Sequence, residues 1–124
     1  MTIGGRLYPL HLAIARQWKV HYYTSDMAAQ EAYRAEEAAF LADMPGVLGA
    51  EAMAALERVN RALGLDYGGV DFALDAKGRL LLFEANATMI AAPPPPDGIW
   101  AYRRPAFDRV RAAAQALLLA RAQG

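Results

Sequence analysis

The segment that most constrains the fold is a pair of apolar runs, 67–74 and 79–85, separated by the sequence Asp75-Ala76-Lys77-Gly78. Each run has the length of a strand, and Asp and Gly at the junction are typical of a tight reversal of the chain. We therefore predict a β-hairpin. The middle of the second run, 80–83, has no polar face, which predicts a strand buried on both sides.

The N-terminal stretch also has the residue pattern of strands. Apolar residues alternate with others over 6–15, where Pro9 indicates an edge or a bulge, and again over 18–23. Alternation with a period of two is typical of a strand with one buried face. The two stretches predict a second hairpin that turns at Arg16 and Gln17.

Helical patterns occupy the remaining segments. A first helix is predicted from the Thr24-Ser25-Asp26 cap to Met44, and a second over 50–63 with Gly64 beyond its end. After the prolines at 93–96, a last helix is expected from Pro105. Two strands, two helices, two strands and one helix predict a single α+β domain over 1–124, with helices packed on a mostly antiparallel sheet.

Composition excludes several classes of function. Hydrophobic residues make up 56% of the chain and charged residues 21%, as in a packed globular protein. Thirteen basic residues balance thirteen acidic ones, so no basic surplus points to nucleic acid. There is no cysteine, which removes disulfides and thiol catalysis. Without a signal peptide or a membrane-length apolar run, we expect a cytoplasmic protein that has no membrane partner.

Three oxygen-bearing side chains in the predicted hairpin carry the strongest chemical signal: Asp71, Glu84 and Asn86. Glu84 and Asn86 are two residues apart and therefore share a face of their strand. A loop of two or four residues puts Asp71 opposite Leu82 on that same face, diagonal to Glu84, whereas a loop of three turns it away.

Carboxylates grouped on one face repel each other, and a hard divalent cation relieves that repulsion. Mg²⁺ prefers oxygen ligands and is commonly held by one or two carboxylates together with substrate phosphates. The simpler interpretation is that Asp71 and Glu84 are ordinary surface residues of a hairpin. The position of Glu84 and Asn86 directly after an apolar run favours the metal site.

The sequence GVDFALDAKGRLLLFEANAT, 69–88, resembles the end of the ATP-grasp fold. The stretch RLYPLHLAIARQWKVHYY, 6–23, is similar to the segment before these strands in a branch of that family, some members of which are fused to tetratricopeptide repeats. The resemblance implies that Asp71 and Glu84 bind Mg²⁺ and that Asn86 completes the metal and phosphate site for ATP. It also implies that a basic residue near the first hairpin, Lys19 or Arg16, contacts the phosphates.

The resemblance extends only to the C-terminal subdomain of an ATP-grasp module. The family's N-terminal subdomain, with its glycine-rich phosphate loop, has no counterpart in these residues. We therefore expect a partial module of an ATP-dependent carboxylate ligase-like protein, inactive alone. The alternative is a non-catalytic remnant that self-associates, in which a missing subdomain leaves the aromatic face of the first hairpin exposed and favours a homodimer.

Other polar residues have ordinary structural interpretations. We expect the first helix to bury Ala29, Tyr33, Phe40 and Met44. On the same helix, Glu31, Glu36 and Glu37 are expected to face water. Arg103 and Arg104 are interpreted as solvated residues at the start of the last helix, and His11 and His21 as packed side chains rather than metal ligands.

Overall fold

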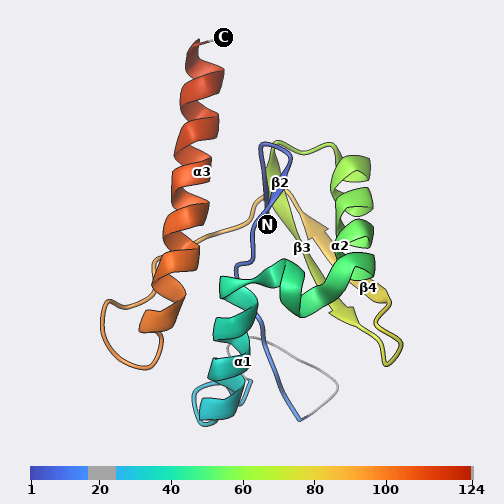
Figure 1. The fold of residues 1–124 in the computed structure, drawn as a ribbon. Coiled ribbons are helices and arrows are strands. Elements are labelled where there is room, and N and C mark those ends of the chain that lie inside the picture. Colours follow the sequence, from blue (N-terminus) through green and yellow to red (C-terminus); the bar gives the residue numbers. More distant parts are fainter. Residues whose placement is uncertain (17–24, 124) are drawn as a thin grey trace.

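The computed structural model describes residues 1–16 and 25–123 and has an α+β fold (Figure 1). Within those residues, a four-stranded antiparallel sheet has the order β2-β1-β3-β4, and three α-helices accompany it. The strands are β1 (Thr2–Ile3), β2 (Arg6–Leu7), β3 (Tyr67–Leu74) and β4 (Leu80–Asn86). The predicted fold class is confirmed at this level.

The hairpin of β3 and β4 forms where the sequence predicts it, and Asp75 organises its turn. Asp75 Oδ1 accepts hydrogen bonds from the backbone N–H of Lys77 at 2.8 Å and of Arg79 at 2.9 Å. Gly78 has a φ of 75°, a left-handed conformation that a glycine adopts without strain. The hydrogen bonds from Arg79 and Lys77 hold the pKa of Asp75 below its ordinary value. All of these contacts lie within the turn itself.

The register of this hairpin differs from the prediction. Leu74 pairs with Leu80, so 75–79 lie between the paired residues, and this odd number alone would place Asp71 opposite Phe83, away from the face of Glu84. A β-bulge between Asp71 and Phe72 leaves one extra residue on β4, so that Asp71 pairs directly with Glu84. The predicted pairing of Asp71 with Leu82 is therefore wrong. The predicted shared face is confirmed, since residues directly opposite each other in an antiparallel pair project from the same face.

β4 lies at the edge of the sheet, and its side chains are far more exposed than predicted. Leu81 and Leu82 are nearly half-exposed, and Phe83 is 69% exposed. The prediction of a strand buried on both faces is wrong, because Leu81 and Leu82 point to opposite faces and both are exposed. Within the described residues, β4 also has no neighbouring strand beyond β3. An all-apolar run could not distinguish a central strand from an exposed edge.

The N-terminal stretch forms much less regular structure than predicted. Only Arg6–Leu7 of the expected 6–15 strand joins the sheet, as β2, and 8–15 continue without strand pairing. Pro9, which has no backbone N–H to donate, stands just beyond the point where pairing stops. The predicted 18–23 strand lies outside the described residues.

The first two helices meet at a sharp corner. α1 (Glu31–Ala42) begins later than predicted, because Asp26–Ala29 form turns, and it ends before Pro45. α2 (Met44–Leu63) follows at an angle of 66°. Asp43 caps it by accepting a hydrogen bond from the Gly46 N–H at 3.0 Å.

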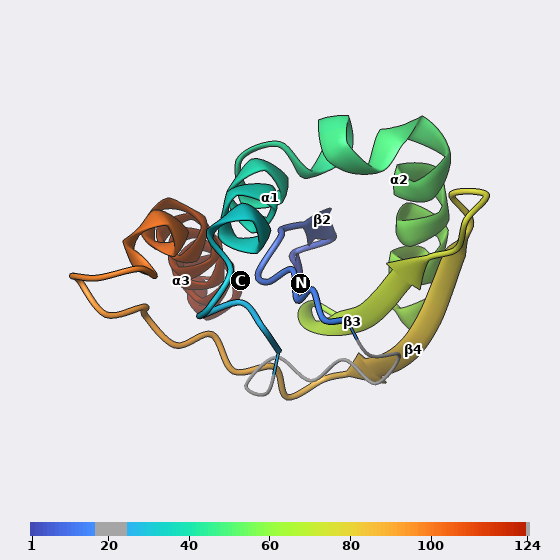
Figure 2. The same ribbon diagram turned by 90° about the horizontal axis from the view of Figure 1, so that it is seen from below.

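Gly49 divides α2 into a short first turn and a longer second part. Its φ of 79° and ψ of 167° are non-helical, so the predicted 50–63 helix corresponds to the part after this break. Gly64 ends the helix at a φ of 61°, as predicted. α2 covers one face of the hairpin (Figures 1 and 2).

The last helix, α3 (Arg104–Gln123), begins one residue before Pro105 and follows the short 3-10 helix η2 (Ala101–Arg103). Its first half lies beside α1 (Figures 1 and 2). There, Ala106 is buried with Phe40, Leu41 and Met44. The second half of α3 extends away from the helices and exposes Leu118 and Leu119. The core therefore lies at the junction of α1, α2 and the start of α3.

Candidate functional site

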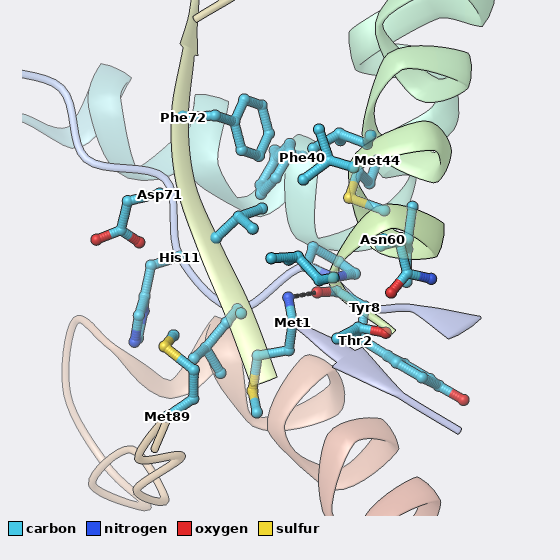
Figure 3. Close-up of a pocket in the computed structure, with 18 residues that line it drawn as sticks. Met1, Thr2, Tyr8, His11, Phe40, Met44, Asn60, Asp71, Phe72 and Met89 are labelled. Carbon is cyan, nitrogen blue, oxygen red and sulfur yellow. Dashed lines mark hydrogen bonds between the residues drawn. The ribbon is translucent and has the colours of Figure 1, made fainter. Parts of the chain in front are cut away.

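The β-bulge brings the two predicted metal-binding carboxylates together. Asp71 on β3 stands directly opposite Glu84 on β4, and both residues are exposed. Figure 3 shows Asp71 on the side of β3 opposite Phe72, which points toward α2. In such a pair the Cβ atoms are about 4.5–5.5 Å apart. Two carboxylates can therefore approach one small cation from neighbouring strands.

Asn86 lies on the same face, and its amide is oriented by a neighbouring residue. It pairs with Gly69, two residues before Asp71. Its Oδ1 accepts hydrogen bonds from the Thr88 N–H at 2.7 Å and from the Thr88 hydroxyl at 2.8 Å. Since both bonds use the oxygen, the amide NH₂ is the group that Asn86 can offer to a phosphate.

The donors at this hairpin are hard oxygens, which fit Mg²⁺ in chemical type. Two carboxylates suit an ion that keeps several waters and takes its other ligands from a phosphate. The described residues contain no group of three or more His, Cys, Asp or Glu side chains that could hold a metal by themselves. The arrangement is therefore suited to a metal that arrives with its phosphate, and less suited to a resident ion.

The predicted basic contacts are not brought to this site by any described interaction. Arg16 is exposed, and no ion pair in the described part of the chain joins it to Asp71 or Glu84. Lys19 lies outside the described residues. His11, in contrast, lies near Asp71, and both line one pocket (Figure 3).

The structure contains a buried polar cluster that sequence reasoning missed, centred on Glu37 of α1. The Glu37 side chain is 0% exposed, so its predicted place on a solvated face is wrong. Its Oε2 accepts hydrogen bonds from the Tyr102 hydroxyl and from Arg103 Nη2 at 2.8 Å. Its Oε1 accepts from the Leu12 N–H at 3.1 Å. We call Glu37, Tyr102, Arg103 and the Leu12 N–H the Glu37 cluster.

Arg103 also departs from its prediction as a solvated residue. Its side chain is 11% exposed, and its guanidinium carbon lies 4.0 Å from the centroid of the Trp100 ring. A cation over an aromatic face is attracted to the ring's negative potential. Arg103 is therefore held between a carboxylate and an indole, and only Arg104 matches the solvated interpretation, paired with Asp108 at 3.3 Å.

Burial changes the proton affinities of this cluster. It raises the pKa of Glu37, although the hydrogen bonds from Tyr102 and Leu12 oppose that change. Burial and the Glu37 carboxylate raise the pKa of Tyr102, and burial lowers the pKa of Arg103 to about 10. Burial, and then the nearby Arg103 charge, lower the pKa of His11 to about 4. His11 Nδ1 lies 3.9 Å from Glu37 Oε1, so a neutral imidazole borders the cluster.

A signal for Glu37 was present in the sequence. Tyr33, Glu37, Phe40 and Met44 follow spacings of four, three and four residues, so Glu37 occupies the apolar stripe of α1. A carboxylate on such a stripe is stable only with buried partners. Those partners lie 65 and 66 positions away, at Tyr102 and Arg103, which no local pattern could supply.

Comparisons with known proteins identify no similar protein or fold. No family model matches the chain, and neither a curated protein nor a solved structure matches it significantly. Among the described residues, no single helix is long and apolar enough to cross a membrane. α1 and α2 satisfy that length and composition only when taken together across their bend.

Proposed function

We propose that the β3–β4 hairpin binds a magnesium–nucleotide, as the metal-binding half of an ATP-grasp-like module. The observation that supports this proposal is the direct cross-strand pairing of Asp71 with Glu84, with Asn86 on the same face. Asp71 and Glu84 would hold Mg²⁺, and the Asn86 NH₂ would donate to a phosphate oxygen of ATP. The metal would neutralise charge on the polyphosphate.

The same proposal defines what these residues contribute to a reaction. In a carboxylate ligase-like enzyme, the γ-phosphate of ATP passes to a carboxylate, and an amine or another nucleophile then displaces it. The hairpin would position the polyphosphate, and its contribution would be orientation and electrostatics rather than proton transfer. Contacts to the base and the remaining phosphates would come from elsewhere, including Arg16 and Lys19. The proposed unit is therefore a binding half-site and not a complete enzyme.

The proposal is tested by isothermal titration of the protein with ATP in the presence of Mg²⁺. We expect micromolar binding, and a loss of at least about tenfold in Asp71→Asn and in Glu84→Gln, because each removes one metal ligand. Glu57→Gln is the matched control, since Glu57 is an exposed carboxylate on α2. Absence of binding, or equal affinity in Glu84→Gln and the control, would contradict the proposal.

A second function, self-association as a homodimer, is favoured by the exposed apolar edge of the sheet. β4 presents Leu81, Leu82 and Phe83 beside backbone that no other strand among residues 1–16 and 25–123 pairs with, apart from β3. An exposed edge strand is a template for pairing with another strand, and these side chains add apolar area to such a contact. A second copy pairing antiparallel along β4 would extend the sheet across both chains.

Sedimentation equilibrium separates this second function from the first. The protein should be dimeric, and Phe83→Lys should make it monomeric by placing a charge on the edge. Ile90→Lys is the control, because Ile90 is 83% exposed but lies beyond the end of β4. A monomer at every concentration, or a dimer that survives Phe83→Lys and Leu81→Lys together, would exclude pairing through β4.

A further inference from the structure

A cavity of about 90 Å³ lies beside β3, between that strand, the extended chain at 8–11 and helices α1 and α2 (Figure 3). Its walls are mainly apolar, and Asp71 and His11 also line it. The apolar residues include Leu7, Phe40, Met44, Leu56, Val70 and Phe72. This space has room for several waters or for one small organic molecule, because a cavity needs about 10–15 Å³ to hold one water.

Two buried oxygen atoms in the lining have no hydrogen-bond partner among residues 1–16 and 25–123: the Thr2 hydroxyl and Asn60 Oδ1. Thr2 is 3% exposed. Asn60 Nδ2 donates to the Gly5 carbonyl oxygen at 3.0 Å, which fixes the amide so that Oδ1 is its other end. Figure 3 shows Asn60 and Thr2 on the same side of the cavity.

Unpaired buried oxygens are costly, and most native polar groups in such positions have partners. Valine would fill the place of Thr2 without that cost. The two atoms also define the chemistry of a partner. Asn60 Oδ1 can only accept a hydrogen bond, whereas the Thr2 hydroxyl can both donate and accept. One hydroxyl or amide group on a ligand would satisfy both atoms.

We propose that this cavity binds a small neutral amphipathic molecule, with an apolar body no larger than one ring and a single hydroxyl or amide group. The apolar walls would hold the body, while Asn60 Oδ1 and the Thr2 hydroxyl would bind the polar group. Most of the walls are apolar and cannot replace the hydration of a charged ligand, although Asp71, His11 and the Met1 amino group also line the cavity. This proposal does not rest on nucleotide binding at the hairpin, although Asp71 belongs to both sites.

Benzyl alcohol and toluene form a matched pair of probes, since they differ by one hydroxyl group. We expect benzyl alcohol to bind and to shift the amide NMR signals of Leu56, Val70 and Phe72. Toluene should bind about tenfold more weakly, the difference that one or two satisfied hydrogen bonds supply. The titrations are made without Mg²⁺ and repeated in Glu84→Gln, so that failure here is distinct from failure at the hairpin.

Thr2→Val is the decisive variant, because it keeps the side-chain shape and removes only the hydroxyl. It should fold, and it should reduce the preference for benzyl alcohol over toluene. Asn60→Leu is a second variant, but it also removes the hydrogen bond to Gly5. The proposal would be overturned if neither probe binds, if both bind equally in the unchanged protein, or if Thr2→Val retains the full preference.

Discussion

Glu37 accepts a 2.8 Å hydrogen bond from Arg103, a residue 66 positions later in the chain, and both side chains are largely buried. The same carboxylate accepts the Leu12 N–H from the extended chain near the N-terminus. One buried side chain therefore joins α1, η2 and the 8–15 segment. The placement of these three segments depends on that charge being paired.

Glu37→Gln is expected to destabilise the fold by about 3–5 kcal/mol. The change removes the carboxylate charge that lies 2.8 Å from Arg103 Nη2, and breaking a buried ion pair costs this order of free energy. The free energy of unfolding is measured by urea denaturation. Glu36→Gln, at an exposed position on the same helix, should change it by no more than about 0.5 kcal/mol. Equal effects at the two positions would mean that the pair is not formed.

Tyr102→Phe is expected to cost about 1.5–3 kcal/mol, the range for a hydrogen bond to a charged group. The hydroxyl donates to Glu37 Oε2, and its loss leaves that oxygen with Arg103 alone. Tyr33→Phe is the control, since its hydroxyl has no hydrogen bond among the described residues. A double-mutant cycle with Glu37→Gln should show coupling, because the second change removes the group that the tyrosine binds.

Stability should fall as the pH decreases from about 6.5 to about 4, in part through His11. Its pKa is lowered from 6.5 to about 4 in the folded protein, so the unfolded chain binds more protons across that window. Glu37 has the opposite effect on stability above pH 4.5. Because its pKa is raised in the folded protein, the folded state binds more protons there than the unfolded chain, and stability increases as the pH falls.

His11→Gln isolates the histidine contribution from that of Glu37. The variant should lose less stability than the unchanged protein between pH 7 and pH 4.5. The difference is expected to be about 1 kcal/mol, reduced by solvent screening because the imidazole is 43% exposed. Urea denaturation at the two pH values measures it. Parallel losses in both proteins would show that His11 keeps its ordinary pKa.

Gly49→Ala is expected to destabilise the protein by about 1–3 kcal/mol through backbone strain alone. No atom lies within 4 Å of the Cβ that alanine would add, but the φ of 79° with a ψ of 167° is a conformation that only glycine adopts readily. Gly64→Ala, at a φ of 61° and a ψ of 27°, should cost less, since that region is accessible to other residues. Thermal denaturation measures the loss of stability in each variant. A larger loss in Gly64→Ala than in Gly49→Ala would argue against the break in α2.

Short-range patterns predicted the hairpin, the helix after Gly49 and the start of α3 to within a residue or two. Asp75 and Gly78 encode their turn through contacts within five residues, and Gly64 ends α2 through its own left-handed conformation. These features depend on neighbours along the chain, which the sequence displays directly. The shared face of Glu84 and Asn86 was also predictable, from the alternation of side chains along one strand.

The direct opposition of Asp71 and Glu84 was not predictable in the same way. It requires the bulge beside Phe72, and the sequence contains no glycine or proline on β4 that would place one there. Likewise, the apolar run of β4 has the composition of a central strand, although it lies at an edge. Composition measures how apolar a strand is, whereas position in the sheet depends on which other strands pair with it.

The sequence by itself determined the β3–β4 hairpin and the helices as element types, the turn chemistry, and the alternation that puts Glu84 and Asn86 on one face. These are consequences of dihedral preferences and of hydrogen bonds between near neighbours. Only the tertiary structure decided that Glu37 is buried, that β4 is exposed, and that Thr2 and Asn60 line one cavity. Burial is a property of segments that meet across tens of residues, and the free energy of placing a charge there depends on partners that no local window contains.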